Sequence, residues 1–177
     1  MNDPIIHLAD LRGSHYVTEA SARRAIELAR PMVETWRRNS NIVGSGFLYV
    51  VIMDPALRPG DCTFEEAILH EAPYGDPDAW DAAYDLFARE KARLSWQHGQ
   101  DSRIVQTTRP YALRHGDSLL GGGIFLDGIV VAASGAFPWF DEAFAGSVAY
   151  WLRALSQEAC QRDIQENKLH TGDLALG

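Results

Sequence analysis

The sequence predicts a single α+β domain in which an antiparallel sheet of two hairpins packs with three main helices. Three stretches of the chain repeat apolar residues at helical spacing, and two pairs of short apolar runs with turn residues between them separate these stretches. The order is therefore helix, hairpin, helix, hairpin, helix. Hairpins give antiparallel strands, and the simplest architecture for this order places the helices on one side of the sheet.

The first helix and the first hairpin occupy the N-terminal half of the chain. Residues 1–17 have the pattern of a loosely attached arm, and Thr18 is a suitable N-cap for the helix that follows. Pro31 is expected to kink or shorten this helix. The continuous apolar run 47–53 predicts a strand that is buried on both faces, and residues 63–74 are expected to be its partner.

The alternation of side chains along that partner strand predicts which residues share a face. Ile68, His70 and Ala72 are expected on one face, and Leu69 and Glu71 on the other.

The second half of the chain has a similar order. Asp78 is a candidate N-cap for a helix that ends at His98, with Gly99 as its C-cap. Asp127-Gly128 is a strong signal for a two-residue hairpin turn between strands 124–126 and 129–133.

An aromatic loop is predicted over residues 137–140, followed by a last helix that Asp141 caps and that ends near Cys160. Residues 18–160 then form one domain, and residues 161–177 have the composition of a C-terminal tail.

Composition and charge restrict the partners. The chain has 177 residues, of which 46% are hydrophobic and 23% charged, as is usual for one globular domain. Its formal net charge of −8 repels phosphate backbones and anionic lipids, which argues against nucleic acid and membrane partners. The first ten residues do not have a signal-peptide pattern, and no apolar stretch is long enough to span a membrane, so we expect a cytoplasmic protein.

Residues 120–135 resemble the GlcG/HbpS-like group, also described as DUF336 or heme-binding-like proteins. The segment has Leu-Gly-Gly-Gly before a strand, an Asp-Gly turn and an apolar return strand that ends in Ser-Gly, with Asp141-Glu142 following after five residues. Alanine-rich residues 20–29 and the Lys91-Ala92 pair resemble further motifs of the group. The resemblance covers most of residues 18–155 and implies a profilin-like sheet, oligomers and, in some members, heme or corrinoid-related binding. Pro55–Cys62, in contrast, lengthens the first hairpin.

Three residues are candidates for catalytic chemistry. His70 lies mid-strand beside Glu71, where an imidazole can ligate a metal or act as a general base and the carboxylate can assist proton transfer. Lys91 falls on the apolar stripe of its helix, and burial there would lower the pKa of its amine and make it a base or nucleophile. Each residue also has a purely structural explanation. His70 is then a histidine on the protein surface and Glu71 a solvated carboxylate. Lys91 is then a lysine whose stem lies on the core while its amine reaches water.

A second set of residues is a candidate for ligand binding. Gly121, Gly122 and Gly123 precede a strand, where bare backbone N–H groups face a ligand or where two segments pack closely. The further candidates are Tyr74, Trp139, Phe140 and Glu142. His98 and His115 are weak candidates for metal or heme ligands, since nothing in their spacing requires them to meet.

The sequence leaves three functions open. The first is a small-ligand-binding protein with heme, or another planar or aromatic molecule, as the candidate ligand. The second is a small enzyme without a nucleotide cofactor, an isomerase, decarboxylase or lyase that acts on an organic acid or aromatic catabolite. The third is an accessory oligomer without chemistry. A homo-oligomer is expected under each of them.

Overall fold

The computed structural model describes residues 13–168, 170 and 171, and its elements follow the order that the sequence predicts. Two short 3₁₀ turns, Pro77–Ala79 and Pro110–Ala112, accompany the main elements. The helices and strands are α1 (Glu19–Trp36), β1 (Leu48–Met53), β2 (Ile68–Tyr74), α2 (Tyr84–His98), α3 (Ser102–Thr108), β3 (Gly123–Leu126), β4 (Ile129–Ser134) and α4 (Pro138–Gln165). Residues 1–12 of the predicted arm and parts of the predicted tail lie outside the described residues.

The two predicted hairpins join into one four-stranded antiparallel sheet with the order β2-β1-β4-β3. β1 and β4 lie in the centre, and every residue of both strands is buried, as their continuous apolar runs indicate. At the turn between β3 and β4, Asp127 and Gly128 have φ values of 52° and 96°. Both values are positive, as a type I′ turn requires, so the predicted hairpin turn is confirmed.

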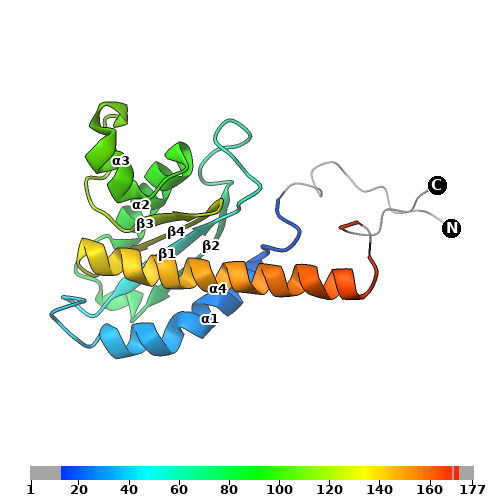
Figure 1. The fold of residues 1–177 in the computed structure, drawn as a ribbon. Coiled ribbons are helices and arrows are strands. Elements are labelled where there is room, and N and C mark those ends of the chain that lie inside the picture. Colours follow the sequence, from blue (N-terminus) through cyan, green and yellow to red (C-terminus); the bar gives the residue numbers. More distant parts are fainter. Residues whose placement is uncertain (1–12, 169, 172–177) are drawn as a thin grey trace.

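Helices cover both faces of the sheet, which corrects the expectation that they pack on one side. α1 and α4 lie side by side on one face, whereas α2 covers the other with α3 packed against it (Figure 1). Two apolar cores result, one between the sheet and the α1–α4 pair and one between the sheet and α2. The two-sided burial of β1 already requires this three-layer arrangement, because each face of a buried strand needs its own cover.

The start of α2 differs from the prediction. We expect a helix from Asp78, but residues Pro77–Ala79 form a separate 3₁₀ turn that Asp76 caps by accepting a hydrogen bond from the backbone of Asp78 at 3.1 Å. α2 then starts at Tyr84. A short acidic side chain that bonds its own neighbouring backbone competes with helix formation, and here it delays the helix by one turn and a half. At the other end, Gly99 has φ 59° and caps the helix as predicted.

α4 starts earlier and ends later than predicted. Residues 137–140 are not a loop, because Phe137 is the N-cap and Pro138 the first helical residue, a position for which the fixed φ of proline is suited. Asp141 therefore lies inside the helix and is not its cap. The helix also passes Cys160 and ends at Gln165.

A β-bulge changes the faces of β2. Ile52 pairs with His70, whereas the next residue of β1, Met53, pairs with Ile68, so one residue of β2 is left over. Ile68 therefore packs in the α2-side core, while Leu69 packs in the α1–α4 core. The prediction that Ile68 shares a face with His70 and Ala72 is wrong for this reason.

No helix in the described part of the chain is both long and apolar enough to cross a membrane.

Candidate functional site

Lys91 and Asp141 form an ion pair in the interior of the protein. Lys91 Nζ lies 2.6 Å from a carboxylate oxygen of Asp141, and each side chain is only 1% exposed. The amine also donates to the backbone oxygen of Ala133 at 3.1 Å and to Ser134 Oγ at 3.3 Å. An ammonium group has three N–H donors, and all three have an acceptor here.

Burial acts on the two groups in opposite directions. It lowers the pKa of Lys91 and raises that of Asp141 to about 6, while the attraction between the two charges opposes both shifts. The other carboxylate oxygen of Asp141 accepts the backbone N–H of Ala136 at 2.9 Å. The pair is thus enclosed, since each side chain is only 1% exposed, and it is fully bonded. This geometry favours a link between α2, β4 and α4 over a reacting group.

The glycines at 121–123 are in close contact with this link. A Cβ on Gly122 would lie 2.7 Å from the backbone oxygen of Ala133 and 2.8 Å from the Cβ of Asp141. A Cβ on Gly121 would meet Glu142 at 2.9 Å. Of the two readings that the sequence allows, these distances favour close packing of two segments over a backbone that faces a ligand.

Glu142, Trp139 and Phe140 lie in the first turns of α4 and point to different surroundings. Glu142 accepts hydrogen bonds from Arg103 of α3 at 2.9 and 3.0 Å. Trp139 is 63% exposed and stacks on Phe137 with 5.5 Å between ring centroids, whereas Phe140 packs against the α1–α4 core. The three side chains therefore do not share one environment.

His70, Glu71 and Tyr74 lie on β2, away from Lys91. His70 Nδ1 is 3.6 Å from a carboxylate oxygen of Glu19 of α1, and burial lowers the pKa of its imidazole. Glu71 lies on the α2 side and forms an ion pair with Arg89, which lowers the pKa of its carboxyl group. The structure therefore does not bring His70 and Lys91 together as one acid–base pair.

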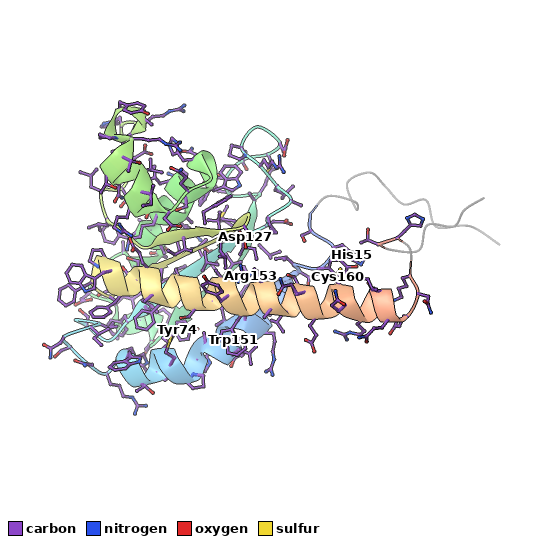
Figure 2. The ribbon with its side chains drawn as sticks, in the orientation of Figure 1. His15, Tyr74, Asp127, Trp151, Arg153 and Cys160 are labelled. Carbon is purple, nitrogen blue, oxygen red and sulfur yellow. The ribbon has the colours of Figure 1, made fainter. Side chains whose placement is uncertain are left out.

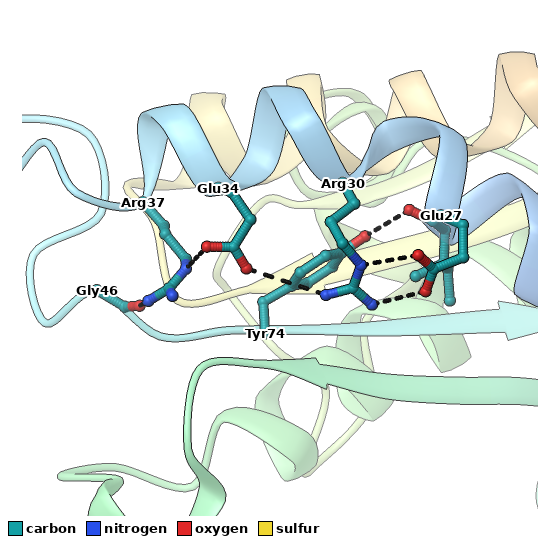
Figure 3. A network of polar contacts seen from close by, with 7 residues as sticks. Glu27, Arg30, Glu34, Arg37, Gly46 and Tyr74 are labelled. Atoms are coloured by element: carbon teal, nitrogen blue, oxygen red, sulfur yellow. Dashed lines mark hydrogen bonds and ion pairs between the residues drawn. The ribbon is translucent and has the colours of Figure 1, made fainter.

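Tyr74 has a structural environment, which Figure 3 shows together with the surrounding ion pairs. Its hydroxyl group donates to the backbone oxygen of Ile26 at 3.1 Å, and the guanidinium group of Arg30 lies 5.1 Å above its ring. Burial raises the pKa of this hydroxyl group. Tyr74 thus joins the edge strand to α1.

A cavity of about 360 Å³ lies where the lengthened first hairpin meets the C-terminal end of α2 and the β3–β4 turn. The hairpin loop, which runs from Pro55 to Cys62, provides one wall and is fixed by a hydrogen bond of 2.8 Å from the indole N–H of Trp96 to the backbone oxygen of Leu57. The cavity is lined by Asp54, Pro55, Leu57, Arg58, Pro59, Trp96, Gln97, His98, Gly99, Phe125, Gly128 and Val130. Of this group, His98 is a candidate in the sequence analysis and Arg58 is not. The extra length of the 55–62 loop is the one feature of the sequence that points to Arg58.

The charged groups of the cavity differ in how they are bonded. Asp54 accepts backbone hydrogen bonds from Ser14 at 3.1 Å and Ala56 at 2.8 Å, so its carboxylate holds the loop. Within the part of the chain that the structure describes, the guanidinium group of Arg58 and the imidazole of His98 have neither a hydrogen bond nor an ion pair.

His115 lies in the exposed segment after the second 3₁₀ turn and does not line this cavity. Among residues 13–168, 170 and 171, no group of three or more His, Cys, Asp or Glu side chains is arranged to hold a metal ion.

The fold has a counterpart among solved structures. The crystal structure of Klebsiella pneumoniae protein ORFY, described as family-model DUF336, superposes with a TM-score of 0.51 over 87% of this chain and 98% of that chain. The chain has a DUF336-like fold. The predicted resemblance is thereby confirmed at the level of the fold, at 14% sequence identity. No family model matches the sequence, and no curated protein matches it.

Proposed function

We propose that this DUF336-like protein binds a small organic acid with a planar apolar body in the cavity between the 55–62 loop and the end of α2. The observation that carries the proposal is that Arg58 and His98, which have no side-chain partner among the described residues, lie on a cavity that also has the aromatic side chains of Trp96 and Phe125 in its wall. Aromatic walls with a few convergent polar groups are the usual composition of a small-molecule site.

Size supports a small ligand. Ligand pockets commonly have volumes of roughly 300–1,000 Å³, and this cavity, at about 360 Å³, is at the lower end of that range. Heme iron needs an axial side chain such as histidine, and His98 could supply one. The volume, however, favours a ligand smaller than a heme, since a porphyrin would require the 55–62 loop to move.

Charge supports an acidic ligand. The chain carries a net charge of −8. Arg58, whose guanidinium group has no partner among the described residues, is a positive group on the concave surface of this otherwise acidic protein. The planar guanidinium group of Arg58 suits a carboxylate, to which it can donate two parallel hydrogen bonds. Trp96 and Phe125 then face the apolar body of the ligand.

The proposal is tested by isothermal titration calorimetry of the purified protein with a panel of planar aromatic monocarboxylates. A hydrogen bond to a charged group contributes about 1.5–3 kcal/mol, so Arg58→Ala is expected to weaken binding at least about tenfold. His98→Ala is expected to weaken it as well. Arg38→Ala and His115→Ala change the same residue types outside the cavity and are expected to leave the affinity unchanged.

Two results would contradict the proposal: wild-type protein that shows no saturable binding to any acid of the panel, or binding that Arg58→Ala and His98→Ala leave intact. A separate titration with hemin reads the visible spectrum. A saturable Soret shift that His98→Ala abolishes, without binding of the smaller acids, would replace the proposed ligand by heme at the same cavity.

A further inference from the structure

The outward face of α4 is apolar and exposed. At 100° per residue, Trp139, Ala143, Gly146, Tyr150 and Ala154 fall within one narrow stripe of the helix, which we call the α4 stripe. Trp139 is 63% and Tyr150 56% exposed. Large exposed aromatic side chains in one stripe are typical of an interaction surface and are rare on the free surface of a monomer.

The opposite face of the same helix is already used. Phe144, Val148 and Leu152 pack in the α1–α4 core, where each is at most 4% exposed. α4 is therefore apolar on two opposite sides over its first half, a property of helices that are covered all round. Figure 1 shows α4 at the front of the molecule, with no other helix or strand over its outward side.

The order of large and small residues makes the stripe complementary to itself. If a second α4 lies antiparallel with the crossing point between Gly146 and Ser147, Trp139 faces Ala154 of the second copy and Tyr150 faces Ala143. Each aromatic side chain then meets an alanine, and the smallest residue lies at the crossing, where the helix axes come closest. A two-fold interface requires a surface that is complementary to itself in this way.

Charge distribution favours the same contact. Each copy carries a net charge of −8, so two copies repel each other wherever acidic surfaces meet. Residues 143–152 of α4 have no charged side chain. The charged groups beside the stripe are neutralised within the chain, since Arg153 pairs with Asp127 at 2.6 Å (Figure 2) and Glu142 pairs with Arg103.

We propose that two copies of this chain associate through the α4 stripe, antiparallel about a two-fold axis near Gly146 and Ser147. Trp151, which is 43% exposed and lies on the flank of the stripe, extends the contact toward α1 (Figure 2). Stable homodimers bury roughly 1,200 Å² or more in total, so flanking side chains of this size are needed beside the helix pair.

Sedimentation equilibrium of the full chain in the micromolar range tests the association. Wild-type protein is expected to be a dimer. The Ala143→Glu variant, which places two carboxylates in the interface, is expected to be a monomer with an unchanged circular dichroism spectrum. Ala82→Glu adds the same charge at an exposed position outside α4 and is expected to stay dimeric. A monomeric wild type, or a dimer that Ala143→Glu leaves intact, overturns the proposal.

Disulfide trapping tests the register without relying on a destabilised variant. In the proposed register residue 143 faces residue 150 of the other copy, whereas two copies of residue 143 are about 10 Å apart along the helix, beyond disulfide reach. A mixture of Ala143→Cys and Tyr150→Cys chains is expected to form the 143–150 disulfide on mild oxidation, and Ala143→Cys alone to form none at that position. Peptide mass spectrometry separates this bond from any that involves Cys62 or Cys160. A 143–143 disulfide, or none in the mixture, would contradict the antiparallel arrangement.

Discussion

At the scale of single residues, the glycines at 121–123 show how one motif supports two readings that only geometry separates. Gly122 has φ +128°, and a side chain there would meet Ala133 and Asp141. An alanine combines overpacking with an unfavourable backbone, so Gly122→Ala is expected to lower the free energy of unfolding by about 2–4 kcal/mol. Urea unfolding measures this loss. Gly44→Ala is the matched control, since a Cβ at Gly44 meets nothing within 4 Å, and a loss of equal size there would contradict the steric explanation.

At the scale of elements, the ion pair of Lys91 and Asp141 joins α2 to α4 across β4. Lys91→Met leaves the buried carboxylate of Asp141 without its charged partner, so we expect it to cost about 3–5 kcal/mol of unfolding free energy. The double variant Lys91→Met, Asp141→Leu removes both charges and is expected to recover most of that loss. Chemical denaturation of both variants measures the difference. If the double variant is as unstable as the single one, the cost lies in lost packing and not in the isolated charge.

The elements that the sequence predicts correctly are those that depend on residues close together in the chain. The structure confirms both hairpins, the caps Thr18 and Gly99 and the buried run of β1, all of which depend on neighbouring residues. The partner strand, expected over residues 63–74, is shorter and starts at Ile68. The role of Asp141 depends on Lys91, which lies fifty residues earlier in the chain. The residues next to Asp141 indicate only a helix cap. The bulge in β2 likewise follows from its pairing with β1 and leaves no local signal. Arg58 was missed because its environment exists only when the loop meets α2.

At the scale of the whole molecule, the stability of the fold is expected to depend on the protonation of His70. Burial lowers the pKa of this imidazole below its ordinary value of 6.5, so the unfolded chain binds a proton more readily than the folded one. The contribution of His70 is therefore fully present above pH 6.5 and is lost as the pH falls toward and through its folded pKa. The slope from one such group is at most about 1.4 kcal/mol per pH unit.

The test compares wild-type protein with His70→Gln, which keeps a polar side chain of similar size but does not titrate. Between pH 7.5 and pH 5 the wild type is expected to lose more unfolding free energy than the variant, as measured by urea denaturation at each pH. The comparison with the variant is needed because Asp141 titrates in the same pH range and acts in the opposite direction. Its pKa is raised to about 6 in the folded protein, so the folded form binds a proton more readily than the unfolded chain and gains stability on acidification. His115→Gln changes an exposed imidazole and is expected to follow the wild-type curve. Parallel curves for the wild type and His70→Gln would show that the neighbouring Glu19 compensates the burial of His70 in full.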